Sequence, residues 1–186
     1  MRLSCVLLVF SSVSAQTPTS PGLYAVFHTS QGDITAKLEE KYTPIAVRNF
    51  VALAQGAKPW FDVETKTMVK RPLYDNVPFH RVIPGEMIQA GPNCGIRIPD
   101  ELLPGLRFDR AGKLAVANTG DPDTGGCQFF ITTDAVPRWN QKYTIFGEVV
   151  AGQDVVNKIN RGPVHDDKPL DPVKLISVAI ERIAKR

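Results

Sequence analysis

Short apolar segments, separated by clusters of turn-forming residues, run along most of the chain. In several of them apolar and polar residues alternate, a two-residue period that is typical of β-strands because successive side chains point to opposite faces. Gly, Pro, Asn and Asp between the segments indicate turns. The pattern predicts strands over residues 23–29, 33–38, 79–83, 87–90, 113–118, 128–133, 143–150 and 173–183.

Two segments follow a helical period instead. Thr43 and Pro44 are suited to begin a helix, because Thr is a good N-cap and Pro fits the first helical position. Apolar residues then recur at helical spacing up to Ala54, and a second amphipathic helix is predicted over residues 152–160. About eight strands and two helices predict a mainly β antiparallel barrel or sandwich, whose open ends the helices could plug.

Residues 58–76 form a long polar connection that contains Trp60 and Phe61. Connections of this length are usually functional or are excursions from the core. We interpret this one as a solvated insertion, with a contribution to substrate binding as the alternative.

Composition limits the classes of protein and partner. The chain has 186 residues, of which 43% are hydrophobic and 22% charged, so we expect a globular protein with one domain and its own core. The net charge of +3 is too small to indicate a nucleic-acid partner.

The first residues differ in character from the rest. Arg2 supplies a positive charge, an apolar run follows, and Val13-Ser14-Ala15 ends it with small side chains. This layout is typical of a secretory signal peptide, and the run is too short for a stable membrane anchor. We predict cleavage near Ala15 and export, either to a periplasm or out of the cell. The predicted layout is a signal peptide (1–15), a tether (16–22) and one domain (23–186).

The sequence gives little support for a metal site or for a catalytic cysteine. The histidines, His28, His80 and His165, lie far apart, and neither zinc-like Cys spacing nor a phosphate-binding loop occurs, so we expect no metal and no other cofactor. Cys94 and Cys127 remain after cleavage, and both a disulfide and free thiols are open. A hydrolase with Cys127 as nucleophile and His80 as base is a minor alternative.

The other candidate residues form a set without a nucleophile. Arg81 and Phe79 would share a strand face, as would Gln89 and Met87. Rotation about an X–Pro peptide bond needs no bond to be broken, and its barrier is roughly 18–20 kcal/mol. The permanently charged Arg81 could donate a hydrogen bond to the proline nitrogen, which regains its lone pair in the twisted transition state. The full set is Phe79, Arg81, Met87, Gln89, Asn118, Gln128, Phe130 and Trp139.

Three motifs carry a resemblance to a known family. They are Phe79-His80-Arg81-Val82-Ile83-Pro84-Gly85 with Met87 and Gln89, then Val116-Ala117-Asn118 with Gly126-Cys127-Gln128-Phe129-Phe130-Ile131, then Thr144-Ile145-Phe146-Gly147. In this order and spacing they resemble the signatures of the cyclophilins, over residues 23–183. The resemblance implies a closed eight-stranded antiparallel β-barrel capped by two α-helices. It also implies a peptidyl-prolyl cis-trans isomerase that assists folding. Together with the predicted signal peptide, we expect a bacterial-like, exported member of this family.

The resemblance assigns roles to individual positions. Arg81 matches the catalytic arginine, and the partners are expected to be proline-containing polypeptides. No cofactor is implied, and we expect a monomer. Substrate-binding positions are expected at Phe79, Met87, Gln89, Ala117, Asn118, Gln128, Phe130, Trp139 and Tyr143.

The chain departs from the family pattern at two places. Glu86 stands where the family usually has a Phe that lines the proline pocket, and a carboxylate there could pair with Arg81 and compete with substrate. Arg138 falls where many members have a Trp, unless the alignment slips by one residue and places Trp139 there. Glu86 motivates an alternative function, a proline-peptide binding module or chaperone with little catalytic turnover.

Overall fold

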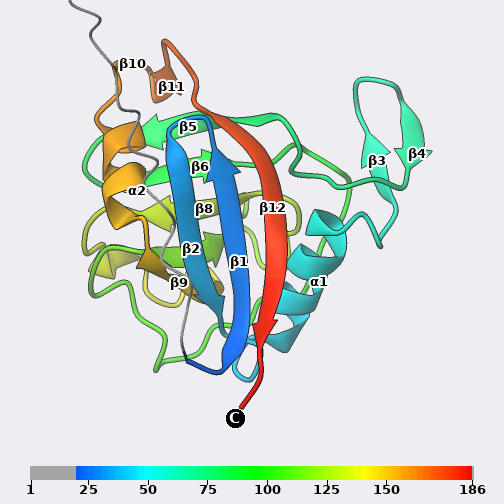
Figure 1. The fold of residues 1–186 in the computed structure, drawn as a ribbon, viewed down its shortest axis with the longest axis horizontal. Coiled ribbons are helices and arrows are strands. Elements are labelled where there is room, and N and C mark those ends of the chain that lie inside the picture. Colours follow the sequence, from blue (N-terminus) through cyan, green and yellow to red (C-terminus); the bar gives the residue numbers. More distant parts are fainter. Residues whose placement is uncertain (1–19, 186) are drawn as a thin grey trace, which may run out of the picture.

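Eight strands close into a barrel in the computed structural model, which describes residues 20–185 (Figure 1). Every neighbouring pair of barrel strands is antiparallel. The expected barrel is confirmed and the sandwich alternative is wrong. The predicted signal peptide and most of the tether, residues 1–19, lie outside the described residues. Around the barrel the order is β1 (Gly22–Thr29), β12 (Lys174–Ile183), β5 (Val77–Ile83), β6 (Met87–Ala90), β8 (Phe129–Thr132), β7 (Lys113–Val116), β9 (Ile145–Ala151) and β2 (Gly32–Leu38).

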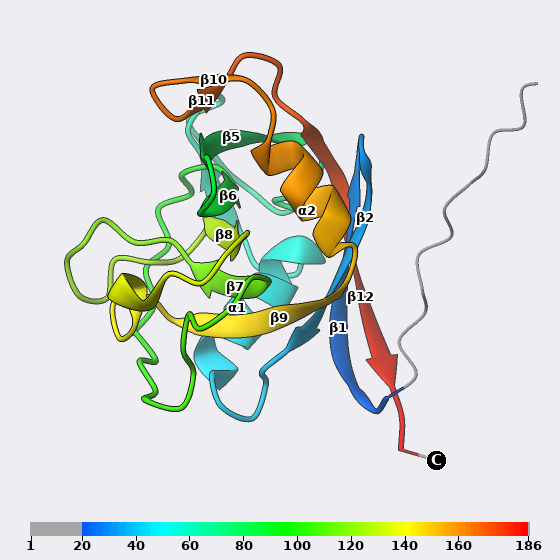
Figure 2. The same ribbon diagram turned by 90° about the vertical axis from the view of Figure 1, so that its left-hand side faces the viewer.

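Two α-helices pack against the barrel, as expected. Helix α1 (Pro44–Ala54) contacts β9 and β12, and helix α2 (Gln153–Asn160) contacts β2 and β6, which Figure 2 shows alongside it. Phe50 and Leu53 of α1, with Val156 and Ile159 of α2, join the interior core. A short 3₁₀ helix, η1 (Pro137–Trp139), precedes β9. None of the helices within residues 20–185 is long and apolar enough to cross a membrane.

The start of α1 differs in one detail from the expectation. Pro44 occupies the first turn as predicted, but the Thr43 side chain does not cap the helix. The Thr43 hydroxyl donates to the Glu39 carbonyl instead. The Glu101 carboxylate accepts the backbone N–H groups of Ile45 and Ala46 at 3.1 and 2.9 Å. A negative group from a distant loop therefore satisfies the electropositive helix start.

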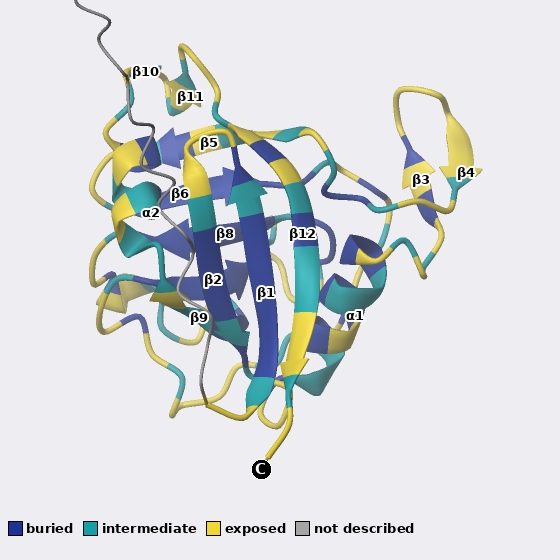
Figure 3. Cartoon of the chain, viewed as in Figure 1, coloured by how far each residue is buried: buried dark blue, intermediate teal, exposed yellow. Residues whose placement is uncertain are grey.

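Strands β6, β7 and β8 are buried on both faces (Figure 3). Their inward side chains, among them Ile88, Leu114 and Ile131, belong to the barrel core. Three of their outward side chains, Met87, Ala115 and Phe130, join a second apolar cluster, which two loops cover. Since successive residues point to opposite faces, one strand thus supplies both the core and the cluster under the functional site. The buried members of the second cluster are Met87, Phe108, Ala115, Phe130, Val136 and Ile145.

Three strands are shorter than predicted on the side of the candidate site. Asn118, Gln128 and Tyr143 lie outside the strands, although the alternation had placed all three in them. The Asn118 amide donates to the Lys142 carbonyl, and its oxygen accepts the Gly120 N–H. Such side-chain hydrogen bonds to the backbone compete with strand pairing and explain why β7 ends at Val116.

Two small hairpins were not predicted. They pair β3 (Trp60–Asp62) with β4 (Thr67–Val69) and β10 (Val164–His165) with β11 (Lys168–Pro169). Strands of two or three residues carry too little alternation to be recognised. The first hairpin agrees only in part with the interpretation of residues 58–76 as a solvated insertion, since residues 63–68 are exposed but the base of the hairpin is packed. Trp60 is buried, and its indole N–H donates to the Arg71 carbonyl at 2.9 Å.

The two cysteines left open by the sequence are joined by a disulfide. Cys94 follows β6 and Cys127 precedes β8, and their Cα atoms lie 6.0 Å apart. Gly91 permits this close approach, because a Cβ there would lie 2.6 Å from the Cys127 carbonyl oxygen. A disulfide-bonded sulfur is not a thiolate, so the structure contradicts the hypothesis of Cys127 as a nucleophile.

Asn160, at the end of α2, holds the β5–β6 turn. Its side-chain oxygen accepts the Gly85 N–H at 2.8 Å. Its amide donates to the carbonyls of Ile83 and Met87 at 2.8 and 3.0 Å. The residue is buried, so these three hydrogen bonds fix the turn that leads into the candidate site.

Replacement of Asn160 should therefore destabilise the fold. Asn160→Ala leaves buried backbone groups without partners, and we expect the free energy of unfolding to fall by about 2–3 kcal/mol. Urea unfolding monitored by fluorescence would measure this. Asn157→Ala on the same helix is the control, since it removes one part-buried side-chain hydrogen bond and should cost clearly less. Equal losses in the two variants would contradict the assigned role.

Candidate active site

A cavity of about 270 Å³ opens on the outer side of the barrel, where β5 and β6 meet the ends of β7 and β8. Most of the residues predicted for the site come together here, although they lie far apart in the sequence. A further part of the lining is supplied by η1 and the residues after it. The cavity is lined by Arg81, Ile83, Glu86, Met87, Gln89, Ala117, Asn118, Phe130, Arg138, Trp139 and Tyr143.

The apolar wall consists of three aromatic rings that pack edge to face. Phe130 lies 5.4 Å from Trp139 and 5.2 Å from Tyr143, measured between ring centroids. Phe108, which the sequence reasoning missed, stacks behind Phe130 at 5.9 Å and is fully buried. Aromatic contacts of this geometry stabilise the arrangement beyond the area they bury. The rings, with buried Met87, form a rigid apolar cup.

Phe79 does not belong to this cup, which corrects its assignment to substrate binding. It is fully buried in the barrel core. Phe79 pairs with Ala90 and Arg81 pairs with Gln89, so one extra residue, His80, is inserted in β5. Such a β-bulge reverses the alternation and separates residues two apart onto different faces. Phe79 therefore points inward while Arg81 points outward.

The guanidinium of Arg81 is held by Asp167 at the rim of the cavity. Its Nε and Nη2 atoms donate to one Asp167 carboxylate oxygen at 3.3 and 3.2 Å, and both side chains are nearly half exposed. Asp167 lies in the turn between β10 and β11, where Asp166 and Asp167 have positive φ angles of 50° and 61°. Its carbonyl accepts the Val82 N–H at 2.8 Å, so the hairpin is fastened to β5. The sequence reasoning missed Asp167, although Asp-Asp is a recognisable turn signal.

Glu86 does not pair with Arg81, contrary to the expectation. It forms an ion pair with Arg138, which also lines the cavity. The Arg138 guanidinium also lies over the Trp139 ring, 5.3 Å from its centroid. Trp139 is thus part of the wall and Arg138 part of the rim. The carboxylate is neutralised and leaves Arg81 unopposed from this side.

A row of three amide side chains leads away from the cavity. The Gln89 amide donates to the Gln128 oxygen at 2.7 Å, and the Gln128 amide donates to the Asn93 oxygen at 3.0 Å. Gln128 lines a neighbouring groove of about 310 Å³ and not the 270 Å³ cavity. The expected substrate-binding residue Gln128 therefore lies beside the cavity and not in it. Gln89, Ala117 and Asn118 line both the groove and the cavity.

His80 occupies the bulge between Phe79 and Arg81. Burial lowers the pKa of His80 below its ordinary value of 6.5, a hydrogen bond with the Gln128 side chain partly offsets this, and the charge of Arg81 lowers it further. The imidazole is therefore neutral at pH 7. No group of three or more His, Cys, Asp or Glu residues within residues 20–185 is arranged to hold a metal ion.

Comparison with known proteins identifies the family. The family model described as cyclophilin type peptidyl-prolyl cis-trans isomerase/CLD matches residues 24–180. The chain belongs to the cyclophilin family. Peptidyl-prolyl cis-trans isomerase A of Mycobacterium tuberculosis is 42% identical, over 84% of this chain and 91% of that protein. Peptidyl-prolyl cis-trans isomerase B of Streptomyces anulatus is 42% identical, over 86% of this chain and 97% of that protein.

Solved structures agree with this cyclophilin fold. The crystal structure of a cyclophilin type peptidyl-prolyl cis-trans isomerase from Cryptosporidium parvum superposes with a TM-score of 0.74 at 29% identity, covering 87% of this chain and 98% of that one. A second crystal structure of the same protein, in the presence of the dipeptide Ala-Pro, has a TM-score of 0.73 at 29% identity, with 86% and 99% covered.

The pKa of His80 makes a prediction for stability. Because its pKa is lower in the folded state, the unfolded chain binds more protons around pH 6.5, and acid favours unfolding. The contribution of His80 to the free energy of unfolding is fully present above pH 6.5, and it is lost as the pH falls through the lower pKa that His80 has in the folded state. We expect His80→Gln to lose less stability than the wild type on acidification from about pH 7 to 5. Urea unfolding at a series of pH values measures this, and superimposable profiles would contradict it.

Proposed function

We propose that this cyclophilin accelerates cis–trans rotation of X–Pro bonds in polypeptide substrates at the 270 Å³ cavity, with Arg81 as the catalytic residue. Isomerase activity follows from membership of the family. The observation that supports the location is a permanently charged guanidinium at the rim of an apolar cup that contains no nucleophile.

The apolar cup is suited to the ring of a proline. Met87, Phe130 and Trp139 form an apolar wall against which a small ring can pack, and the burial of Met87 and Phe130 and the packing of Trp139 on Phe130 give it a fixed shape. Tyr143 adds an aromatic edge with a polar tip. A held ring leaves the chain on the other side of the X–Pro bond free to turn, which is the motion that isomerisation requires.

The polar groups next to the cup are suited to hold the peptide backbone. The Gln89 side chain and the edge formed by Ala117 and Asn118 line the cavity. Within residues 20–185, the backbone N–H of Asn118 makes no hydrogen bond, whereas that of Ala117 donates to the Gln128 carbonyl at 3.0 Å. An extended substrate can pair with a free backbone group of this kind, as a strand adds to a sheet edge.

Arg81 supplies the interaction that favours the transition state. Loss of amide resonance gives most of a barrier of roughly 18–20 kcal/mol, and rotation returns the lone pair to the proline nitrogen. A guanidinium N–H can donate to that nitrogen only in the twisted geometry, so the hydrogen bond lowers the barrier and not merely the substrate's energy. Asp167 engages Nε and Nη2 and leaves Nη1 without a partner among residues 20–185.

Replacement of Arg81 tests this mechanism. We expect Arg81→Ala to lower kcat/KM roughly 10- to 100-fold in a protease-coupled assay on an Ala-Pro peptide, the loss of one charge-assisted hydrogen bond. Asp167→Asn keeps the shape but removes the charge that orients the guanidinium, and should cost about two- to five-fold because the pair is exposed. Arg182→Ala is the matched control and should keep full activity, because Arg182 is an exposed arginine on β12 that pairs with Glu40.

The same assay separates this function from the alternative. A proline-peptide binding module or chaperone would bind the peptide and show no rate above background. Glu86, which motivated that alternative, is paired with Arg138 and does not block Arg81. Full activity in Arg81→Ala would leave isomerase activity in place and reject the assigned catalytic residue.

We also propose that the enzyme is of the bacterial type, is exported, and acts as a monomer. The apolar N-terminal run supports cleavage near Ala15. The disulfide between Cys94 and Cys127 supports an oxidising compartment, where such bonds persist. Mass spectrometry of the protein from its native host should find Gln16 as the first residue, and size-exclusion chromatography should give a monomer. A native chain that retains Met1 would contradict export.

A further inference from the structure

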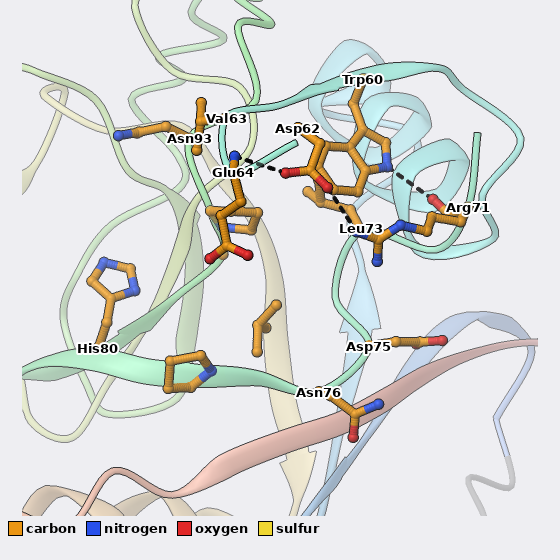
Figure 4. A pocket seen from close by; sticks show the side chains of 14 residues that line it. Trp60, Asp62, Val63, Glu64, Arg71, Leu73, Asp75, Asn76, His80 and Asn93 are labelled. Atoms are coloured by element: carbon orange, nitrogen blue, oxygen red, sulfur yellow. Dashed lines mark hydrogen bonds and ion pairs between the residues drawn. The ribbon is translucent and has the colours of Figure 1, made fainter. Parts of the chain in front are cut away.

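A second cavity, of about 370 Å³, lies between the β3–β4 hairpin and β5 (Figure 4). Its accessible apolar surface comes from residues such as Val63, Pro78 and Pro92, in front of the buried Trp60, and its polar surface includes Glu64 and His80. The hairpin is not a loose excursion here, because the Phe61 N–H donates to the Cys94 carbonyl at 3.1 Å and fastens it to the loop after β6. Neither the isomerisation mechanism nor the fold makes use of this cavity.

The cavity adjoins a groove that in turn adjoins the substrate site, because neighbouring depressions share lining residues. Pro92 and Asn93 line both this cavity and the 310 Å³ groove. That groove in turn shares Gln89, Ala117 and Asn118 with the 270 Å³ cavity of the candidate active site. The hydrogen-bonded amides of Gln89, Gln128 and Asn93 run along this path. A polypeptide whose proline is held in the 270 Å³ cavity can therefore extend along the groove toward the β3–β4 hairpin.

The free charge in the second cavity is negative. Arg71 is already engaged, since it pairs with Asp62 at 2.9 Å and lies over the Trp60 ring at 5.0 Å. Within residues 20–185, Glu64 and Asp75 form no ion pair. The Glu64 N–H donates to the Asp62 carboxylate, and the Glu64 carboxylate points into the space between the hairpin and β5 (Figure 4).

We propose that this cavity is a secondary subsite for a Lys or Arg side chain of the same polypeptide whose proline occupies the cup. The inference rests on the proposed function, because it assumes a substrate bound at Arg81. A basic side chain has an apolar stem and a charged head. The stem matches the accessible apolar surface of Val63, Pro78 and Pro92, and the head matches Glu64, with Asp75 adding to the negative field.

This subsite changes affinity and not the chemical step. The basic side chain contacts the enzyme equally in the ground state and in the twisted state, since it is remote from the rotating bond. Uniform binding of this kind lowers KM and leaves kcat unchanged. The carboxylates are partly exposed to water, so the expected gain is about two- to five-fold in KM.

Peptides that differ in one residue test the proposal. A series based on one Ala-Pro peptide carries a single Lys, moved one position at a time from the proline toward either end, and each peptide has a partner with Gln at that position. At one or two adjacent positions the Lys peptide should have a KM about two- to five-fold lower than its Gln partner, at equal kcat. The preference should vanish in Glu64→Gln and weaken in Asp75→Asn. Glu181→Gln, an exposed site on β12, is the matched control and should retain it.

Each result decides a separate question. Equal KM values for Lys and Gln at every position, or a preference that survives Glu64→Gln, would overturn the subsite. A wild-type protein that isomerises no peptide would overturn the proposed function. Binding of the Lys and Gln peptides to that protein would then test the subsite directly. In that case the indole N–H signal of Trp60 in nuclear magnetic resonance should shift with the Lys peptide and not with the Gln peptide. No shift with either peptide would overturn the subsite as well.

Discussion

Closure of the antiparallel sheet is the constraint on which the rest of the molecule depends. In β6, β7 and β8 every second side chain must fill the barrel, and the residues between them are then forced outward together. Met87 and Phe130 meet on the outer face for this reason, where Trp139 covers them. The substrate cup is thus a second, smaller core that shares its strands with the first. A rigid cup follows from a rigid barrel, because a strand cannot shift its outer residues without shifting its inner ones.

The charges around the cup are arranged by elements outside these strands. Arg81 stands at the rim because a bulge at His80 turns it away from the core, and a two-residue turn brings Asp167 to its guanidinium. Glu86 and Arg138, both in the lining of the cavity, neutralise one another. As a result, Asp167 engages only the Nε and Nη2 edge of the Arg81 guanidinium. The side chain is held in position, and its remaining N–H groups can donate to a substrate.

The fold could be predicted to a large extent because its signals are local. Two-residue alternation identified the barrel strands, and Pro44 marked the start of α1. The failures have physical causes that no local pattern contains. Glu101 caps α1 from a loop more than fifty residues away. Phe79 was assigned to the wrong face because a bulge depends on the partner strand and not on the strand that carries it.

The sequence by itself determined the set of chemical groups and the family, since three ordered motifs contain Arg81, the apolar wall and the backbone edge. Only the tertiary structure decided how charged side chains pair and which depressions join. Arg81 pairs with Asp167 and not with Glu86, and the β3–β4 hairpin adjoins the substrate groove. Strand patterning depends on neighbours along the chain, whereas ion pairs and adjoining grooves depend on distances between distant segments, which the closed barrel and the turns packed on it establish.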